Sequence, residues 1–116
     1  MEPNYYYEHL CEPWFSLILL GIKKVEGRKN KGRFKEIKIG DIIQFYNDDY
    51  KLRTFSVKIT KKVEYNSIQD YLLGEGIDKC LPGIPSLDHA LSVYYKWNTK
   101  EEEEKYRFIS IKFELI

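Results

Sequence analysis

Three residues capable of acid–base or recognition chemistry lie within one six-residue segment: Lys23, Glu26 and Arg28. If this segment is a strand, Glu26 and Arg28 face the same way, because they are two positions apart, and Lys23 faces away from Glu26. A Glu–Arg pair on one face is either a structural ion pair or a recognition pair. In a recognition pair the carboxylate accepts from the amino group of a base, and the guanidinium binds a phosphate or a carbonyl. Both interpretations stay open at this point.

Lys23 and Glu75 add a catalytic interpretation. A lysine whose pKa is lowered by burial can act as a base or a nucleophile; the alternative for Lys23 is an ordinary surface lysine. Glu75 lies between Gly74 and Gly76, where glycines allow close backbone approach or unusual dihedral angles. The alternative for Glu75 is the end of a flexible helix. We therefore take Lys23, Glu26 and Glu75 as the catalytic candidates.

Aromatic and basic residues supply the candidates for nucleic-acid binding. Trp14 either stacks on a base at the mouth of a cleft or packs in the core. Tyr95 and Lys96 stand at the end of a predicted helix and could line the same cleft. With the basic residues near Arg28, the candidates for nucleic-acid binding are Trp14, Lys23, Arg28, Lys29, Lys31, Arg33, Tyr95 and Lys96.

The charge is balanced in total but unevenly placed along the chain. The net charge is +1, yet residues 23–38 and 51–62 together carry +11, which leaves −10 for the remainder. If these two segments fold side by side, they form a positive face that attracts polyanions through counterion release. The alternative is a solvated, lysine-rich surface on strands and loops.

Composition excludes several other classes of function. The chain has two cysteines and two histidines, too few for a disulfide framework or a histidine-rich metal site, so we predict no metal. It contains no glycine-rich phosphate loop, and we predict no cofactor. No apolar run approaches roughly 18 residues, so we predict no membrane-spanning helix. The sparse cysteines and the absence of a basic, apolar leader favour an intracellular location, cytoplasmic or nuclear.

The pattern of apolar residues predicts an α+β domain spanning residues 1–116, in which residues 1–11 form an N-terminal tail or an edge segment. Pro13 begins a short buried helix that ends before Gly21, and Ser67 and Ser86 cap two further helices, the second being the longest. A basic loop is expected at 29–38 and a solvated acidic loop or helix end at 101–104. Four to six strands fit a small, partly closed mixed β-barrel with flanking helices. The expected strands are 22–28, 42–46, 52–63 and 106–116.

Four segments of the chain resemble a known family. They are EPWF at 12–15, GIKKVEGR at 21–28, GDIIQF at 40–45 and YNSIQDYL at 65–72. Together they resemble the ASCH domain of the PUA-like superfamily, in its small single-domain branch, over nearly the whole chain. The resemblance implies a small β-barrel with helices beside it and a cleft between them. It also implies either RNA binding or chemistry on a nucleobase.

Two classes of function follow from the resemblance and the charge pattern. The first is an RNA-binding module with a nucleobase-sized cleft beside a basic surface, whose partner is RNA or another single-stranded nucleic acid. The second is a small enzyme that cleaves RNA or acts on a modified nucleoside. Similarity to bacterial acetylcytidine amidohydrolases places their lysine at Lys23 and their glutamate at or near Glu75, whereas their threonine falls on Glu26, a departure that removes a proton-relay partner. A protein-interaction domain that has kept the barrel is the third possibility.

Overall fold

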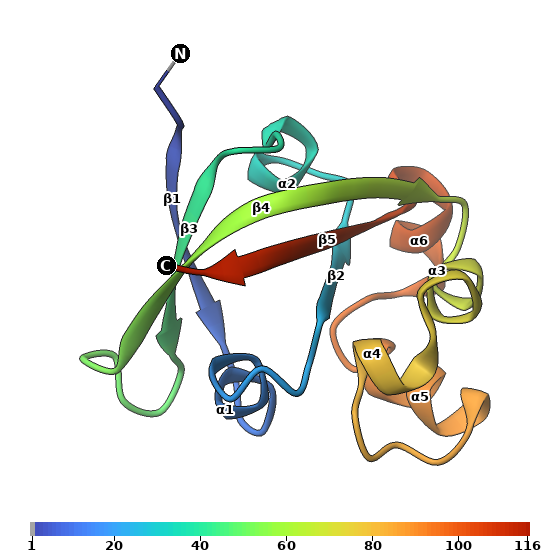
Figure 1. Ribbon diagram of the computed structural model, residues 1–116. Helices are drawn as coiled ribbons and strands as arrows, with labels where there is room; N and C mark the ends of the chain where they lie inside the picture. Colours follow the sequence, from blue (N-terminus) through green and yellow to red (C-terminus); the bar gives the residue numbers. More distant parts are fainter. Residues whose placement is uncertain (1) are drawn as a thin grey trace.

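The computed structural model describes residues 2–116, which form a five-stranded sheet curled into a half-barrel with several short helices (Figure 1). The sheet order is β1-β3-β4-β5-β2, so β1 and β2 are its two edges. β1 runs parallel to β3, and the other neighbours are antiparallel. The predicted α+β, partly closed mixed barrel is confirmed. The strands are β1 (Tyr5–Leu10), β2 (Val25–Lys29), β3 (Ile42–Asn47), β4 (Thr54–Tyr65) and β5 (Phe108–Leu115).

The helices fall into two groups around this sheet. In the view of Figure 1, α3 to α6 gather beside β2, whereas α2 lies above the curled sheet and α1 below it. Contacts join α3 to α5 and to β5, and join α4 and α6 to β2. The edge strand β2 therefore lies between the half-barrel and the helical group. The helices are α1 (Trp14–Leu19), α2 (Arg33–Glu36), α3 (Ile68–Glu75), α4 (Ile77–Cys80), α5 (Leu87–Tyr94) and α6 (Lys100–Tyr106).

The two faces of the sheet bury two separate hydrophobic clusters. Successive side chains of a strand point to opposite faces, so on β5 Ile109 and Ile111 enter the interior of the half-barrel, whereas Phe108 enters the helical cluster. On β2, Val25 also belongs to the helical cluster. The side chain of Glu26, the next residue, therefore projects toward the half-barrel.

A glycine allows the helical group to pack directly onto β2. A Cβ atom at Gly27 would lie 2.5 Å from Phe108 Cε2 and 2.5 Å from Tyr71 Cζ, which no side chain could occupy without displacing these rings. Tyr71 and Phe108 are themselves fully buried, with ring centroids 5.0 Å apart. The close contact holds the middle of β2 against α3 and fixes where its neighbours Glu26 and Arg28 stand.

Several sequence expectations need correction. The expected strand at 22–28 begins only at Val25, and the expected basic loop at 29–38 contains the helix α2. Of the two alternatives for the acidic run, a loop or a helix end, the structure has the second, because the run begins α6, which a capping box between Thr99 and Glu102 starts. α5 is no longer than α3, since each has 8 residues. Of the first eleven residues, Tyr5–Leu10 forms the edge strand β1. No helix within residues 2–116 is long and apolar enough to cross a membrane.

Candidate functional site

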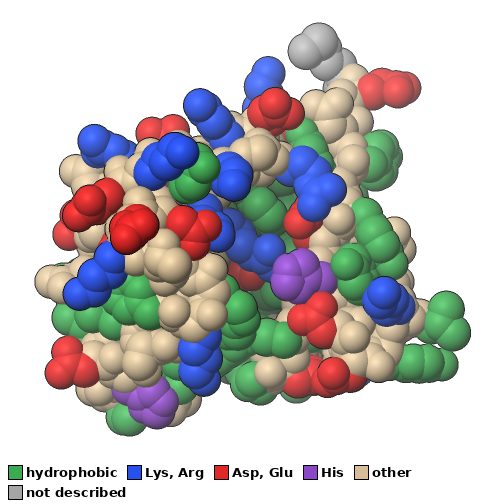
Figure 2. Space-filling model, turned by 180° about the vertical axis from the view of Figure 1, so that it is seen from behind, with side chains coloured by type: hydrophobic (Ala, Val, Ile, Leu, Met, Phe, Trp, Pro, Cys, Tyr) green, Lys and Arg blue, Asp and Glu red, His purple; other side chains and the backbone are tan. Residues whose placement is uncertain are grey.

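A cavity of about 270 Å³ lies where the two edge strands meet the helical group. Figure 2 shows this side of the molecule, with Lys and Arg side chains gathered above the hollow and a histidine at its side. Its volume lies just below the roughly 300–1,000 Å³ of sites for drug-sized ligands, which suits a single nucleobase or nucleoside. The residues that line it are His9, Leu10, Cys11, Trp14, Lys23, Glu26, Gly27, Arg28, Lys29, Asp48, Leu81, Tyr94, Trp97 and Asn98.

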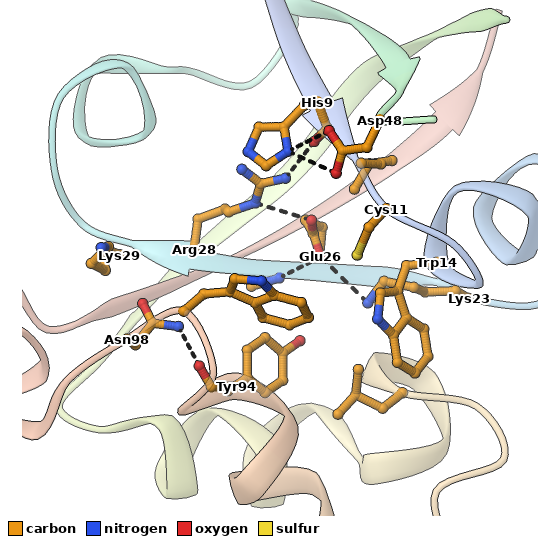
Figure 3. Close-up of a pocket in the computed structure, with 14 residues that line it drawn as sticks. His9, Cys11, Trp14, Lys23, Glu26, Arg28, Lys29, Asp48, Tyr94 and Asn98 are labelled. Atoms are coloured by element: carbon orange, nitrogen blue, oxygen red, sulfur yellow. Dashed lines mark hydrogen bonds and ion pairs between the residues drawn. The ribbon is translucent and has the colours of Figure 1, made fainter. Parts of the chain in front are cut away.

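A buried carboxylate, Glu26, stands between two cations in this cavity (Figure 3). Its Oε2 accepts a hydrogen bond from Arg28 Nε at 3.0 Å, and its Oε1 lies 3.4 Å from Lys23 Nζ and 3.3 Å from the Gly27 amide nitrogen. Burial by itself would raise the pKa of the Glu26 carboxyl, but the two cations outweigh it and hold the pKa below its usual value. Glu26 is therefore an anion at neutral pH, with part of its acceptor capacity still unused.

Lys23 reaches Glu26 because it precedes β2 instead of lying on it, so the expectation that these two side chains face opposite ways is wrong. Its side chain is only 1% exposed. Nζ donates to the carbonyl of Val25 at 2.6 Å and to the carbonyl of Cys80. With Glu26 these acceptors match the three N–H donors of an ammonium group. Burial lowers the pKa of Lys23, and the attraction of Glu26 opposes that shift. With all three N–H groups engaged, Lys23 Nζ is an ammonium group without a free lone pair. It contributes a buried positive charge to the lining of the cavity.

Arg28 closes the gap between the two edges of the sheet. Besides its bond to Glu26, its Nη2 donates to the backbone carbonyl of His9 on β1 at 2.9 Å. Its guanidinium carbon lies 5.0 Å from the ring centroid of Phe34. An ion pair also joins β1 to α2, from Arg33 Nε to Glu8 Oε2 at 2.6 Å. The side chain of Arg28 thus joins β2 to β1, and Arg28 and His9 both line the cavity.

Aromatic rings form another part of the lining. The chain has two tryptophans, and both line this cavity. Trp14 is half-buried, with Lys23 Nζ 5.8 Å from its ring centroid, whereas Trp97 is 52% exposed. Tyr94 is buried, with its hydroxyl 2.7 Å from that of Tyr71. Exposed indole surface beside fixed charges is suited to a flat, polar ring such as a nucleobase.

The mouth of the cavity carries titratable side chains. His9 Nδ1 lies 3.0 Å from Asp48 Oδ1, and Lys29 Nζ lies 2.9 Å from Glu102 Oε2. Burial raises the pKa of the half-buried Cys11 thiol, which keeps it protonated at neutral pH. No group of three or more His, Cys, Asp or Glu side chains within residues 2–116 is arranged to hold a metal ion.

Of the predicted catalytic residues, Glu75 is not brought to the cavity. Its Oε2 accepts from Tyr65 Oη at 2.5 Å and from Ser110 Oγ at 2.9 Å, and its Oε1 lies 3.5 Å from Lys112 Nζ. Burial and the neighbouring Glu75 carboxylate raise the pKa of Tyr65 to about 12. Ser110 pairs with Gly27 across β5 and β2, and both face the helical group. Glu75 therefore lies on the opposite side of the sheet from Glu26.

The predicted nucleic-acid-binding residues are also divided. Trp14, Lys23, Arg28 and Lys29 line the cavity. The others lie outside it: Tyr95 donates to Glu103 Oε1 at 2.7 Å, Lys31 Nζ lies 4.8 Å from the Tyr106 ring centroid, Arg33 pairs with Glu8, and Lys96 lines a neighbouring cavity.

The two basic segments do meet, because Lys62 Nζ donates to the carbonyls of Lys35 and Ile37, each at 2.9 Å. They do not form an uninterrupted positive face, however. Acids from other parts of the chain pair with several of their cations, as Glu102 does with Lys29 and Glu12 with Arg53. The free positive charge near the cavity is therefore smaller than the segment totals suggest.

Acid should weaken the fold through Glu26. Its folded pKa lies below the ordinary 4.5, so its stabilising contribution is complete above that pH and is lost as the pH falls toward the folded pKa. We expect the free energy of unfolding, measured in urea from pH ~7 to ~3, to decrease below pH ~4.5. Glu26→Gln should show a shallower decrease, though not a flat one, because Glu12 and Glu75 also have lowered pKa values. An unchanged slope in Glu26→Gln would contradict this assignment.

Comparison with known proteins places this architecture in a family. The chain is similar to the crystal structure of the hypothetical protein PH0355, with 35% identity, a TM-score of 0.87 and coverage of 97% of this chain and 99% of that one. It is also similar to the solution NMR structure of protein PF0455 from Pyrococcus furiosus, with 32% identity, a TM-score of 0.79 and coverage of 97% of each chain.

A crystal structure of a ZmASCH mutant from Zymomonas mobilis shares the fold, with a TM-score of 0.60 at 10% identity, covering 98% of this chain and 70% of that one. The search of curated proteins gives no match. The ASCH domain family itself matches residues 9–116, nearly the full length. The chain therefore belongs to the ASCH domain family.

Proposed function

We propose that this protein binds single-stranded RNA by taking one unpaired nucleobase into the cavity between β1, β2 and the helical group. ASCH domains belong to the PUA-like fold family, which is associated with RNA binding. The observation that carries the proposal is a cavity of about 270 Å³ that is lined both by a buried carboxylate, Glu26, and by the indole rings of Trp14 and Trp97.

Each part of the cavity matches one part of a nucleotide. A base stacks on an indole ring whatever its sequence, since every base has a π-face. Glu26 has acceptor capacity left for an N–H donor on the edge of the base. Arg28 in the cavity wall and Lys29 at its mouth supply positive charge for the backbone phosphates. RNA is the favoured ligand because its sequence-specific readers mostly bind splayed-out bases of single strands.

Binding should be salt-dependent, and Lys29 should contribute to that dependence. Anisotropy of a labelled, mixed-sequence single-stranded RNA should show affinity that falls linearly on a log–log plot against salt. Lys29→Ala should weaken binding several-fold and reduce the salt slope by about 1. Lys58→Ala is the matched control, because Lys58 is exposed on β4 and lies outside the cavity lining. Absence of RNA binding at low salt, or equal effects of both variants, would overturn the proposal.

One observation favours the hydrolase alternative, namely the lowered pKa of Lys23 within the same cavity as Glu26. Against it stand the three acceptors around Lys23 Nζ and the placement of Glu75 on the other side of the sheet. Incubation with acetylcytidine separates the two functions. Turnover that disappears in Lys23→Met, in a variant still folded by circular dichroism, would replace binding by catalysis as the primary function.

A further inference from the structure

A second cavity of about 370 Å³ adjoins the first. It lies between the start of α1 on one side and α5 with the loop that precedes it on the other. The two cavities share Cys11, Trp14 and Trp97, so the indole rings stand at their junction. Its lining residues are Cys11, Glu12, Pro13, Trp14, Pro82, Gly83, Ile84, His89, Val93, Lys96 and Trp97.

The second cavity combines apolar walls with unpaired positive charge. Pro13, Pro82 and Ile84 offer flat or aliphatic surface. Lys96 is exposed, and no carboxylate of the described chain, residues 2–116, lies within 4.0 Å of its ammonium group. The apolar walls of this cavity suit a base, and the unpaired ammonium group of Lys96 suits the phosphate joined to it.

The acid in this cavity is already engaged. Glu12 Oε1 accepts from the Ser16 amide at 2.9 Å, and Oε2 accepts from Ser16 Oγ at 2.6 Å and lies 3.4 Å from Arg53 Nη1. The hydrogen bonds from Ser16 lower the pKa of Glu12, with a smaller contribution from Arg53. Arg53 balances the negative charge of Glu12, whereas the ammonium charge of Lys96 stays unpaired and complements a phosphate.

We propose that the second cavity binds the nucleotide next to the one held in the first, with Lys96 on the connecting phosphate. The inference rests on the proposed function and extends it. The ligand is a run of at least two consecutive nucleotides, with one base on each side of the tryptophan junction. A free nucleoside or mononucleotide fills only half of the site.

Affinity as a function of length tests this inference. Mixed-sequence ribonucleoside 5′-monophosphates and dinucleotides carrying a 5′-phosphate are titrated into the full chain while tryptophan fluorescence is followed. Because stacking contributes about 1–3 kcal/mol per base, the dinucleotides should bind at least about fivefold more tightly than the monophosphates. Lys96→Gln should weaken dinucleotide binding several-fold, and more than it weakens monophosphate binding. Lys79→Gln, at an exposed lysine of α4 outside both cavities, is the control.

The possible results separate this inference from the function on which it rests. If monophosphates and dinucleotides bind equally well and Lys96→Gln has no effect on either, base binding in the first cavity stands and the second subsite is wrong. If neither length binds at low salt, the proposed function fails and this inference fails with it. Lys96 is exposed, so the variant should keep the wild-type melting temperature, and loss of folding cannot explain a change in affinity.

Discussion

Replacing Glu26 with alanine is expected to lower the free energy of unfolding by about 3–5 kcal/mol, the usual cost of removing one partner from a buried ion pair. The carboxylate faces Lys23 Nζ at 3.4 Å and Arg28 Nε at 3.0 Å, with Lys23 1% and Arg28 21% exposed. Without Glu26, a fully buried ammonium and a partly buried guanidinium face each other uncompensated. Urea unfolding at neutral pH measures the loss.

A double variant separates this electrostatic cost from simple loss of packing. Adding Lys23→Met to Glu26→Leu removes both charges of the pair and keeps the volume apolar, which should recover much of the stability lost by Glu26→Ala. Glu114→Ala, at an exposed glutamate on β5, should change stability by less than about 0.5 kcal/mol. If Glu26→Ala lowers the free energy of unfolding by less than about 1 kcal/mol, the ion pairs of Glu26 with Lys23 and Arg28 do not stabilise the fold as argued.

Replacing Trp14 with alanine is expected to weaken single-stranded RNA binding by about fivefold to 150-fold, because loss of a stacked base costs about 1–3 kcal/mol. Trp14 lines both cavities and lies over Lys23 Nζ. The expected decrease is therefore larger than for any single lysine at the mouth. Anisotropy at fixed low salt measures it.

Two further variants test whether the ring itself is responsible. Trp14→Phe keeps an aromatic face and should retain most of the affinity. Tyr5→Ala removes an aromatic side chain that is 73% exposed at the start of β1, outside both cavities, and should leave binding unchanged. If Trp14→Ala binds RNA as tightly as the wild type, the base does not enter this cavity.

The sequence predicted the centre of the site because its residues are close in the chain. Glu26 and Arg28 share a face by the alternation of a strand, and the structure joins them at 3.0 Å. Lys23 was placed on the wrong face, since residue spacing cannot show that β2 begins only at Val25. Trp14 was left open between core and cleft, and the structure places it half-buried at the cavity wall.

Residues brought together from distant segments could not be found in this way. Three residues of the lining come from distant segments: His9 from β1, Asp48 from the β3–β4 turn and Trp97 from the segment after α5. The residues next to them in the sequence do not indicate that they line a cavity. The position of Glu75 follows from its hydrogen bond with Ser110. Ser110 pairs with Gly27 and faces the helical group, and spacing along the chain does not show this pairing.

The acidic run shows a second limit of reading charge from sequence. Four consecutive glutamates suggest a solvated segment, yet Glu103 is buried. It accepts from the Ile68 amide at the start of α3 at 2.7 Å and from Tyr95 Oη at 2.7 Å. Glu103 on α6 thus caps the start of α3. The neighbouring Glu102 pairs with Lys29 beside the cavity. Composition cannot separate such structural acids from solvated ones.

Tryptophan fluorescence tests the central claim most directly, because both tryptophans of the chain line the cavity. A short single-stranded RNA is titrated into the protein at low salt, and tryptophan emission is recorded beside the anisotropy of a label on the RNA. We predict a saturable change in emission that follows the anisotropy curve and is largely lost in Trp14→Ala. RNA that binds by anisotropy without changing the emission would lie elsewhere on the surface, and that result would contradict the proposed site.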